Sequence, residues 1–289
     1  MVEVVDNNDI DREVTKFQPD VVIIEALWVV PEKFDVLKKL HPTVRWIVRI
    51  HSNIPFLASE GIAVEWIKGY VARGVEVAVN EKRALHDVRT IVADEDLQFL
   101  VIYLPNFYPV VKTEVDAERF EYLHVGCYGA IRPLKNQLLQ AVAAIRYADK
   151  TGQILVFHIN ATRVERGDAE LKNLRSLFAG TKHVLSEDSW LNHEDFVTSL
   201  SILDVGMQVS LSETFSIVAA DLVNAGVPIV VSPEVDWASS ICKVNPTDSF
   251  DIEKGLTRAL QFSGFNVALN RQALRRYDSK TRTQWTAQL

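Results

Sequence analysis

The sequence predicts an α/β protein of two domains, each with a parallel sheet covered by helices. Apolar runs of strand length alternate with segments of helical periodicity from the beginning of the chain, a pattern typical of parallel sheets. The stretch Pro105 to Phe120, PNFYPVVKTEVDAERF, breaks this periodicity and carries two prolines, so we place the domain boundary there. A length of 289 residues is enough for a large core and for one or two domains.

Composition is that of an ordinary globular protein, with 48% hydrophobic and 24% charged residues. The net charge of -7 gives no support for a nucleic-acid backbone as the main partner. Cys127 and Cys242 do not suggest a disulfide framework, which favours the cytoplasm. The acidic N-terminus lacks the apolar segment of a signal peptide, and the apolar stretch Val21 to Val30 contains Glu25 and is too short to span a bilayer.

In the first half, the apolar runs predict four strands, with helices between them. The strands are Val21–Ile24, Val44–Ile50, Val75–Val79 and Phe99–Leu104; the helices are Pro31–Leu40, Glu60–Arg73 and Glu81–Val92; Met1–Val5 is a candidate for one more strand. Polar residues follow three of the strands: His51, Asn80 and Asn106. Because the carboxyl ends of parallel strands open on one edge of a sheet, these side chains are expected to gather there.

The second half repeats the pattern. Strands are predicted at Tyr122–Tyr128, Ile154–Ile159, His183–Leu185, Val205–Val209 and Pro228–Val231, and helices at 137–148, Asp168–Phe178, Glu194–Leu200, Phe215–Asn224, Asp251–Phe262 and Val267–Tyr277. Ser186 to Asn192 is predicted to be a polar loop.

One stretch, Gln208 to Ser232, carries the chemistry. It reads as a strand, a small polar loop, a helix stopped by Gly226 and Pro228, and a second strand. Glu213 and Asp221 are eight positions apart, about two helical turns, so both can face one cleft. The free N–H groups at the helix start can bind phosphate, and the two acids can accept hydrogen bonds from hydroxyl groups of a nucleotide diphosphate sugar. The alternative is an acidic turn that only stabilises its own helix.

This stretch resembles the donor site of the group 1 (family 4-like) GT-B glycosyltransferases, whose motif is Glu, seven residues, Glu and then Gly-x-Pro. The chain has Glu213, then Asp221 in place of the second Glu, then Gly226-Val227-Pro228. It also has Ser216 where many members have Gly. The resemblance implies a GT-B fold, that is, two Rossmann-like domains with parallel sheets.

On this resemblance, residues 1–110 form the first, acceptor-side domain, 121–264 the nucleotide-sugar-binding domain, and 265–289 a C-terminal helix that returns to the first domain. Members usually open with a strand and a Gly-rich loop, and nothing before Val21 has that loop. The first domain is therefore expected to be shortened, either as a natural short form or because the reading frame has lost its beginning.

The resemblance also implies the site residues. Lys135 is in register with a family Lys that neutralises the donor diphosphate, whereas Ala130 stands where an Arg is expected and Arg132 is its substitute. His51 occupies the position of a strand-end His beside the donor sugar. The implied catalytic residues are His51 and Glu213, and the implied donor-binding residues are Arg132, Lys135, Ser212, Thr214, Phe215, Asp221 and Trp190.

The expected function is transfer of a sugar from a nucleotide-sugar donor, such as a UDP- or GDP-sugar, with retention of anomeric configuration. The acceptor is open: a glycan, a lipid, a protein or a nucleic-acid base. No cofactor and no metal are expected, since the sequence has no cluster with metal-ligand spacing. A shortened first domain with an exposed sheet edge predicts self-association, and slow or absent transfer by the isolated chain.

Two alternatives come from other classes. A non-catalytic or degenerate sugar-nucleotide-binding protein is favoured by Ala130 and by the missing Gly-rich loop, and opposed by Glu213, Lys135 and His51. A dehydrogenase is opposed because no Gly-x-Gly-x-x-Gly follows any predicted strand.

Overall fold

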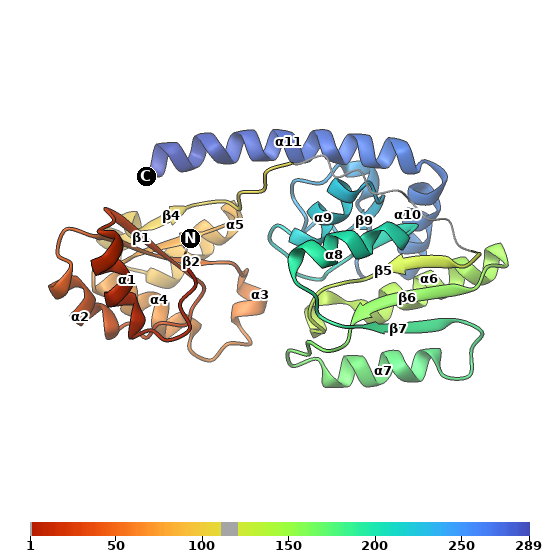
Figure 1. Ribbon diagram of the computed structural model, residues 1–289, viewed down its shortest axis with the longest axis horizontal. Helices are drawn as coiled ribbons and strands as arrows, with labels where there is room; N and C mark the ends of the chain where they lie inside the picture. The colour runs from red at the N-terminus through yellow and green to blue at the C-terminus, as the bar shows by residue number, and fades with distance from the viewer. Residues whose placement is uncertain (1, 111–120) are drawn as a thin grey trace. The chain divides into compact units, whose positions relative to one another are not determined.

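The computed structural model describes residues 2–110 and 121–289, and the chain divides into two compact units (Figure 1). The first unit comprises Met1–Phe107 and Lys280–Leu289, and the second comprises Tyr108–Ser279. Part of the predicted linker Pro105–Phe120, residues 111–120, lies outside the described residues. Each unit contains one parallel sheet, as the alternation of strands and helices predicted.

The first unit is built on a four-stranded sheet with the strand order β1-β2-β3-β4. The strands are β1 (Val21–Glu25), β2 (Arg45–Ile50), β3 (Glu76–Val79) and β4 (Val101–Tyr103), and all neighbours are parallel. The helices are α1 (Asp9–Phe17), α2 (Lys33–Leu40), α3 (Ile54–Leu57), α4 (Ala63–Ala72) and α5 (Lys82–Val92), followed by the 3₁₀ turn η1 (Glu95–Leu100).

The two faces of this sheet are covered differently. On β2, Trp46 and Val48 belong to a large apolar cluster that includes side chains of α1, α2, α4 and α5. Ile47 points to the opposite face, because successive side chains of a strand alternate. There it packs with Leu104 in a small cluster that Trp285 joins from the long helix α11 (Ser263–Gln288). The last turns of α11 thus complete the core of the first unit.

The second unit is built on a five-stranded sheet with the order β7-β6-β5-β8-β9. The strands are β5 (Leu123–Gly126), β6 (Leu155–Asn160), β7 (Val184–Asp188), β8 (Val205–Gln208) and β9 (Ile229–Val231). The helices are α6 (Gln137–Thr151), α7 (Asp168–Phe178), α8 (His193–Ser199), α9 (Ile217–Ala225), α10 (Ser249–Gln261) and the first part of α11, with short 3₁₀ turns between some of them.

Helices cover both faces of this second sheet. Val205 and Met207 of β8 pack in a cluster with apolar side chains of α6, α7 and α10. Ile229 and Val231 of β9 belong to another cluster, with side chains of α9 and with Leu274 of α11. The carboxyl ends of the strands, where loops lead into the helices, are therefore the part of the sheet left for polar groups.

Three of the predicted elements differ from the structure. Residues 2–5 form no strand; instead α1 follows, with Ile10 and Val14 buried at helical spacing. Strand β7 runs on to Asp188, into the predicted loop Ser186–Asn192, because it pairs with β6 as far as Asn160, the last residue of β6. Helix α11 is much longer than Val267–Tyr277 because no proline or glycine follows Gly264 to stop it.

None of the helices in the described ranges combines the length and apolar character that crossing a bilayer requires.

Candidate functional site

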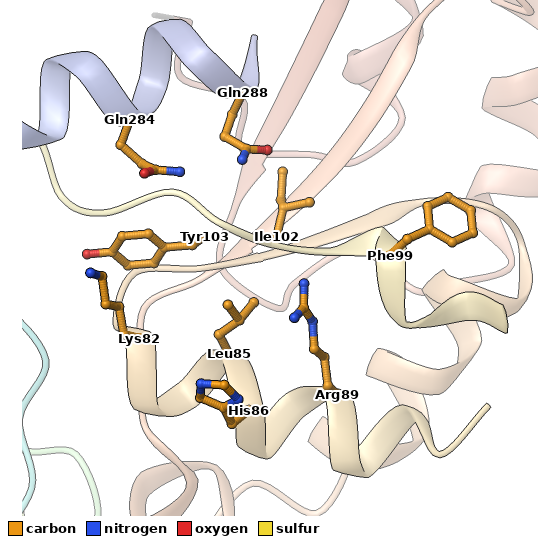
Figure 2. A pocket seen from close by; sticks show the side chains of 9 residues that line it. All are labelled: Lys82, Leu85, His86, Arg89, Phe99, Ile102, Tyr103, Gln284 and Gln288. Carbon is orange, nitrogen blue, oxygen red and sulfur yellow. The ribbon is translucent and has the colours of Figure 1, made fainter. Parts of the chain in front are cut away.

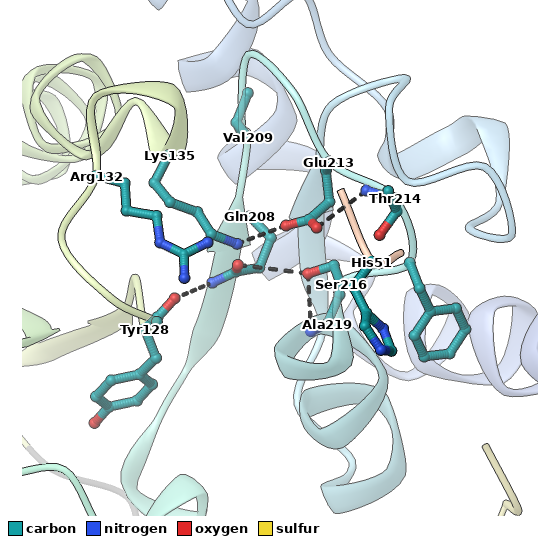
Figure 3. Close-up of polar contacts among 12 residues, drawn as sticks. His51, Tyr128, Arg132, Lys135, Gln208, Val209, Glu213, Thr214, Ser216 and Ala219 are labelled. Atoms are coloured by element: carbon teal, nitrogen blue, oxygen red, sulfur yellow. Dashed lines mark hydrogen bonds and ion pairs between the residues drawn. The ribbon is translucent and has the colours of Figure 1, made fainter. Parts of the chain in front are cut away.

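Glu213 forms an ion pair with Lys135 at the carboxyl edge of the second sheet (Figure 3). It lies in the loop between β8 and α9, and its carboxylate accepts a hydrogen bond from Lys135 Nζ at 2.5 Å and another from the backbone N–H of Thr214 at 3.1 Å. Both side chains are largely buried, with exposed fractions of 18% for Lys135 and 14% for Glu213. Burial raises the pKa of Glu213, but the charge and hydrogen bond of Lys135 outweigh it and leave the pKa lowered. The pair is thus a carboxylate and an ammonium.

Backbone contacts between two loops hold this pair in place. The N–H of Leu211, in the Glu213 loop, donates to the carbonyl oxygen of Leu134 at 2.8 Å. The side chain of Asn136, which has a left-handed backbone at φ 59°, donates to the carbonyl oxygen of Val209 at 3.0 Å. The loop after β5 and the loop after β8 are therefore fixed to each other directly beside Lys135 and Glu213.

Arg132 lies in the same loop as Lys135 but has a different partner. It forms an ion pair with Glu165, which also pairs with Arg163 at 2.7 Å. Its charge still contributes to the lowered pKa of Glu213. Of the two cations predicted to meet a diphosphate, the structure places Lys135 on Glu213 and Arg132 on Glu165.

Ser216 caps α9 with a backbone conformation that favours glycine. Its backbone has φ 57° and ψ 84°, a left-handed conformation that glycine adopts without strain. Its Oγ accepts a hydrogen bond from the N–H of Ala219 at 3.4 Å and donates to Gln208 Oε1 at 3.5 Å. Gln208 in turn donates to the carbonyl oxygen of Tyr128 at 3.0 Å (Figure 3). At the other end of α9, Gly226 has φ 90°, which confirms the predicted helix C-cap.

A pocket of about 290 Å³ lies beside α9 in the second unit. Its apolar lining consists of Trp190, Leu191, Phe196, Ile217 and Val218, and its polar lining of Gly129, Asn160, His193 and Asp221. The ring of Trp190 is 48% exposed, and the Arg163 guanidinium lies 4.3 Å from its centroid. An apolar hollow with a few convergent polar groups is the usual form of a small-molecule site.

Asp221 is the buried acid of this pocket. Its Oδ1 accepts a hydrogen bond from the Tyr108 hydroxyl at 2.5 Å and lies 3.0 Å from His193 Nε2. Burial raises the pKa of Asp221, and the two hydrogen bonds offset only part of that effect.

The pocket and the ion pair are adjacent but distinct. Glu213 and Lys135 are not among the residues that line the pocket. Gly129 connects the two, since it lines the pocket and a Cβ at this glycine would lie 3.7 Å from Lys135 Cε. The two acids predicted to face one cleft therefore lie in two neighbouring parts of one region of the second unit.

The remaining predicted donor-binding residues belong to the loop before α9. Ser212 and Thr214 are partly exposed. The ring of Phe215 is buried in an aromatic cluster with Tyr108, Trp237 and Tyr277, so this side chain packs in the core and holds the loop in place. Only the backbone of Phe215 is left to take part in ligand binding.

Sequence reasoning did not identify Tyr108 or His193 as partners of Asp221. Tyr108 lies 113 positions from Asp221, and no local pattern marks such a pair. It also missed a partly buried chain of hydrogen bonds across β5, β6 and β7, which joins Asp188 to His158 at 2.9 Å and His158 to His124 at 3.0 Å. Burial lowers the pKa of His124. The available signal was one polar residue with a hydrogen-bonding side chain in each of three neighbouring strands, β5, β6 and β7.

In the first unit, the polar residues at the strand ends contact one another, as their positions predicted. His51 Nε2 bonds to Glu25, and the Arg49 guanidinium contacts Glu25 at 2.9 Å and Asn106 Oδ1 at 2.5 Å. Asn80 donates to the carbonyl oxygen of His51 at 3.5 Å. Burial raises the pKa of Glu25, but the bond from His51 and the charge of Arg49 outweigh it and leave the pKa lowered. His51 belongs to this network, and its predicted catalytic role stays a prediction.

Within residues 2–110 and 121–289, no group of three or more His, Cys, Asp or Glu side chains is placed to hold a metal ion.

Comparison with known proteins found similarity in structure and none in sequence. No protein-family model matches the chain, and no curated protein matches it. Among solved structures, the apo structure of OtsA superposes with a TM-score of 0.71 at 11% identity, covering 93% of this chain and 72% of that chain. A UDP-forming α,α-trehalose-phosphate synthase from Burkholderia xenovorans gives a TM-score of 0.71 at 13% identity, covering 97% of this chain and 76% of that one.

A third solved structure, described as trehalose-6-phosphate from E. coli bound with UDP-2-fluoro glucose, has a TM-score of 0.68 at 14% identity, and the match covers 94% of this chain and 72% of that chain. At these identities the similarity shows the fold and nothing more. The fold is GT-B, two Rossmann-like units with parallel sheets, which confirms the fold class that the sequence predicted.

Proposed function

We propose that this chain is a glycosyltransferase that binds a nucleotide diphosphate sugar in its second unit and transfers the sugar to an acceptor. The observation that carries the proposal is the Lys135–Glu213 ion pair, which lies beside the capped start of α9 and next to a pocket that contains Asp221. A cation, a helix N-terminus, an apolar hollow and a buried acid are what a diphosphate, a base and a ribose require of a protein.

The pocket suits the nucleoside. A base can stack on the exposed ring of Trp190 or lie against Leu191 and Ile217, all of which line the pocket. A ribose hydroxyl can then donate to the carboxylate of Asp221, whose Oδ1 already serves Tyr108 and His193. Asn160 adds a further polar group for the edge of the base or the sugar.

The diphosphate belongs between Lys135 and the start of α9. In this position the Lys135 ammonium, now paired with Glu213, would be shared with the phosphate oxygens. Negative charge accumulates on the diphosphate as the sugar departs, so a cation and oriented N–H groups stabilise the transition state more than the ground state. Arg132 would assist from its pair with Glu165, either by its field or after changing partner.

Glu213 would accept hydrogen bonds from hydroxyl groups of the donor sugar and orient it, and His51 would act on the sugar as the family resemblance implies. Retention of configuration is part of the proposal, and one similar solved structure concerns glycosyl transfer with retention by trehalose-6-phosphate synthase. The charge of the diphosphate is met by Lys135 and the start of α9, so the proposed chemistry uses no metal ion and no organic cofactor. Self-association is also proposed, and light scattering tests it.

The test is a binding screen followed by turnover. UDP- and GDP-sugars are added to the whole chain, and a donor that binds the folded state raises its melting temperature. Calorimetry of the best donor is then repeated with Trp190→Ala, which is expected to weaken binding about tenfold if a base stacks there. Phe250→Ala is the matched control, since Phe250 is also exposed and also lies under an arginine, with Arg146 at 4.0 Å.

Three results would contradict the proposal: no stabilisation by any nucleotide sugar, an equal loss of affinity in the Trp190 and Phe250 variants, or no release of free sugar or transferred product from a bound donor. The last result alone would favour the second candidate, a sugar-nucleotide-binding protein without catalysis. That candidate is supported by the engagement of Arg132 with Glu165 and by Ala130, which is buried and uncharged.

A further inference from the structure

A second hollow lies in the first unit, between α5, β4 and the end of α11 (Figure 2). It has a volume of about 470 Å³, within the range of small-molecule sites. Lys82, His86 and Arg89 line it from α5, Tyr103 lines it from β4, and Gln284 and Gln288 line it from α11. All of these residues belong to the first unit, so the hollow is separate from the pocket beside α9.

The hollow is basic in an acidic protein. Lys82, His86 and Arg89 stand at positions i, i+4 and i+7 of α5, so they share one face of the helix over about 10 Å. Among the described residues, none of those that line the hollow carries a carboxylate, although acidic residues outnumber Lys and Arg by 38 to 31 in the chain. In the described part of the chain, none of the three forms an ion pair, whereas their neighbour Arg83 pairs with Glu81 at 2.5 Å.

The cations are positioned by the structure around them. Arg89 Nη2 donates to the carbonyl oxygen of Val101 at 3.1 Å, which fixes the guanidinium beside β4. Its Nε is buried and finds no acceptor among the described residues. Lys82 Nζ lies 6.0 Å from the centroid of Tyr103, and Figure 2 shows it extending toward that ring. A buried N–H donor without an acceptor is costly, so this guanidinium has unused hydrogen-bonding capacity.

The opposite wall supplies neutral polar groups. Figure 2 shows the side-chain amides of Gln284 and Gln288 on α11 above the helix that carries the cations. Amides both donate and accept hydrogen bonds, so they suit hydroxyl groups or the edge of a base rather than a second anion. The hollow therefore offers a cationic, anion-binding end toward α5 and a neutral polar end toward α11.

We propose that this hollow binds a small organic phosphate, the phosphate ester of a sugar or of a nucleoside. Lys82 and Arg89 hold the phosphate through charge-assisted hydrogen bonds, His86 offers a further hydrogen-bonding group, and the organic part lies on Tyr103 and the two glutamines. A nucleic-acid strand is disfavoured because its affinity comes from many phosphate contacts along an extended basic surface, and here two cations, Lys82 and Arg89, line one small hollow.

The test is calorimetry on the whole chain with inorganic phosphate, ribose 5-phosphate and adenosine 5′-monophosphate. At least one ester is expected to bind, and the double variant Lys82→Gln/His86→Gln to raise its Kd at least tenfold. Both positions are exposed, so the variant keeps the fold. Lys39→Gln/Lys68→Gln, two exposed cations on α2 and α4, is the matched control and should bind as the unchanged protein does.

Binding of ribose 5-phosphate would identify a sugar phosphate, and binding of adenosine 5′-monophosphate alone a nucleotide. Trp190→Ala, which removes the ring beside α9 in the other unit, should leave this binding unchanged. The proposal is overturned if no ester binds at millimolar concentration, if inorganic phosphate binds as tightly as the esters, if the control variant loses as much affinity, or if the loss appears with Trp190→Ala instead.

Discussion

The two units use the polar residues at the ends of their strands in different ways. In the first unit, Glu25, Arg49 and His51 bond to one another, and Arg49 also donates to the carbonyl oxygen of Leu104 at 2.9 Å. In the second unit, Glu213 and Lys135 pair across two loops next to a hollow that Asp221 lines. The hollow of the first unit lies along α5 and β4, with none of these strand-end groups in its lining.

This difference indicates what each set of groups does. Polar side chains that satisfy one another hold the ends of their strands together, and their loss is felt in stability. Polar side chains beside a hollow can exchange a protein partner for a ligand, and their loss is felt in binding and turnover. Apart from the role proposed for His51 on the sugar, the first set should therefore matter mainly to the fold, and the second set mainly to donor binding.

The largest effect is expected at Glu213. Glu213→Gln should reduce transfer or donor hydrolysis by about a hundredfold or more, because it removes a positioned charge that acts on the sugar. Glu194→Gln, an exposed acid on α8, is the control and should keep full turnover. A Glu213→Gln protein that turns over a verified donor at the normal rate would show that the ion pair serves only the fold.

The next effect separates the two loop cations. Lys135→Ala should weaken the binding of a nucleoside diphosphate about tenfold or more and leave the binding of the nucleoside nearly unchanged. Only the diphosphate carries the negative charges that Lys135 contacts. Arg132→Ala should reduce the affinity for the diphosphate less, because Arg132 already forms an ion pair with Glu165. Calorimetric titration with both ligands checks this, and equal losses for nucleoside and diphosphate would assign the two cations to a solvated loop.

The sequence predicted the fold because the signals for it are local. Apolar runs of strand length and the Gly226–Pro228 stop are visible in any short window, and the structure has the strands and the helix cap there. The loop residues Lys135 and Glu213 were likewise predictable, since a family motif fixes their positions along the chain. The structure then brings these two together at 2.5 Å.

The partners of the site were not predictable, because they come from distant parts of the chain. Tyr108 reaches Asp221 across 113 positions, and Glu165 engages Arg132 only because a loop after β6 folds back on Ile131, whose carbonyl oxygen accepts from the N–H of Glu165 at 3.0 Å. The basic hollow depends on the length of α11, which brings Gln284 and Gln288 to α5. The periodicity predicted too short a helix because the polar second half of α11 lacks a clear apolar stripe.

A stability effect is expected at Glu25 in the first unit. Glu25→Gln should lower the free energy of unfolding by about 1 kcal/mol at neutral pH, a modest value because this carboxylate is 46% exposed. The pKa of Glu25 is lowered in the fold, so its contribution is present above the unfolded value of about 4.3 and is lost as the pH falls through the folded pKa.

Urea unfolding of this variant at several pH values checks the prediction, with Glu65→Gln on α4 as the control because Glu65 is exposed. Nucleotide affinity should not change. If Glu25→Gln lost as much nucleotide affinity as Lys135→Ala, the strand-end groups of the first unit would not act mainly on stability, and the contrast between the two units would be wrong.

Asp221→Asn should have opposite effects on binding and on stability. It should weaken nucleoside binding because it replaces one carboxylate oxygen, an acceptor for a ribose hydroxyl, with an NH₂ donor. It should also raise the melting temperature at neutral pH. Burial raises the pKa of Asp221, so the folded state favours the protonated acid. Below the pKa of an Asp in the unfolded chain, about 3.9, the two proteins should be equally stable. The protein with Asp221 should become less stable than the variant as the pH rises through the folded-state pKa. Melting curves from acid to neutral pH show the sign, and a variant that is less stable at neutral pH would mean that the charge of Asp221 stabilises the fold.

The smallest effect is expected at Ser216, where two substitutions separate backbone strain from capping. The left-handed backbone at φ 57° costs a non-glycine residue about 1 kcal/mol, and the Oγ bond to Ala219 N–H returns part of that as a helix cap. Ser216→Gly relieves the backbone strain, and because glycine is tolerated at an N-cap the lost capping bond costs only a few tenths of a kcal/mol. This variant should therefore have the same free energy of unfolding or a slightly higher one. Ser216→Ala keeps the strain and loses the cap, so it should destabilise the protein by about 1 kcal/mol. If the two variants unfold at the same urea concentration, neither strain nor capping at this residue contributes measurably, and glycine is not favoured here for its backbone.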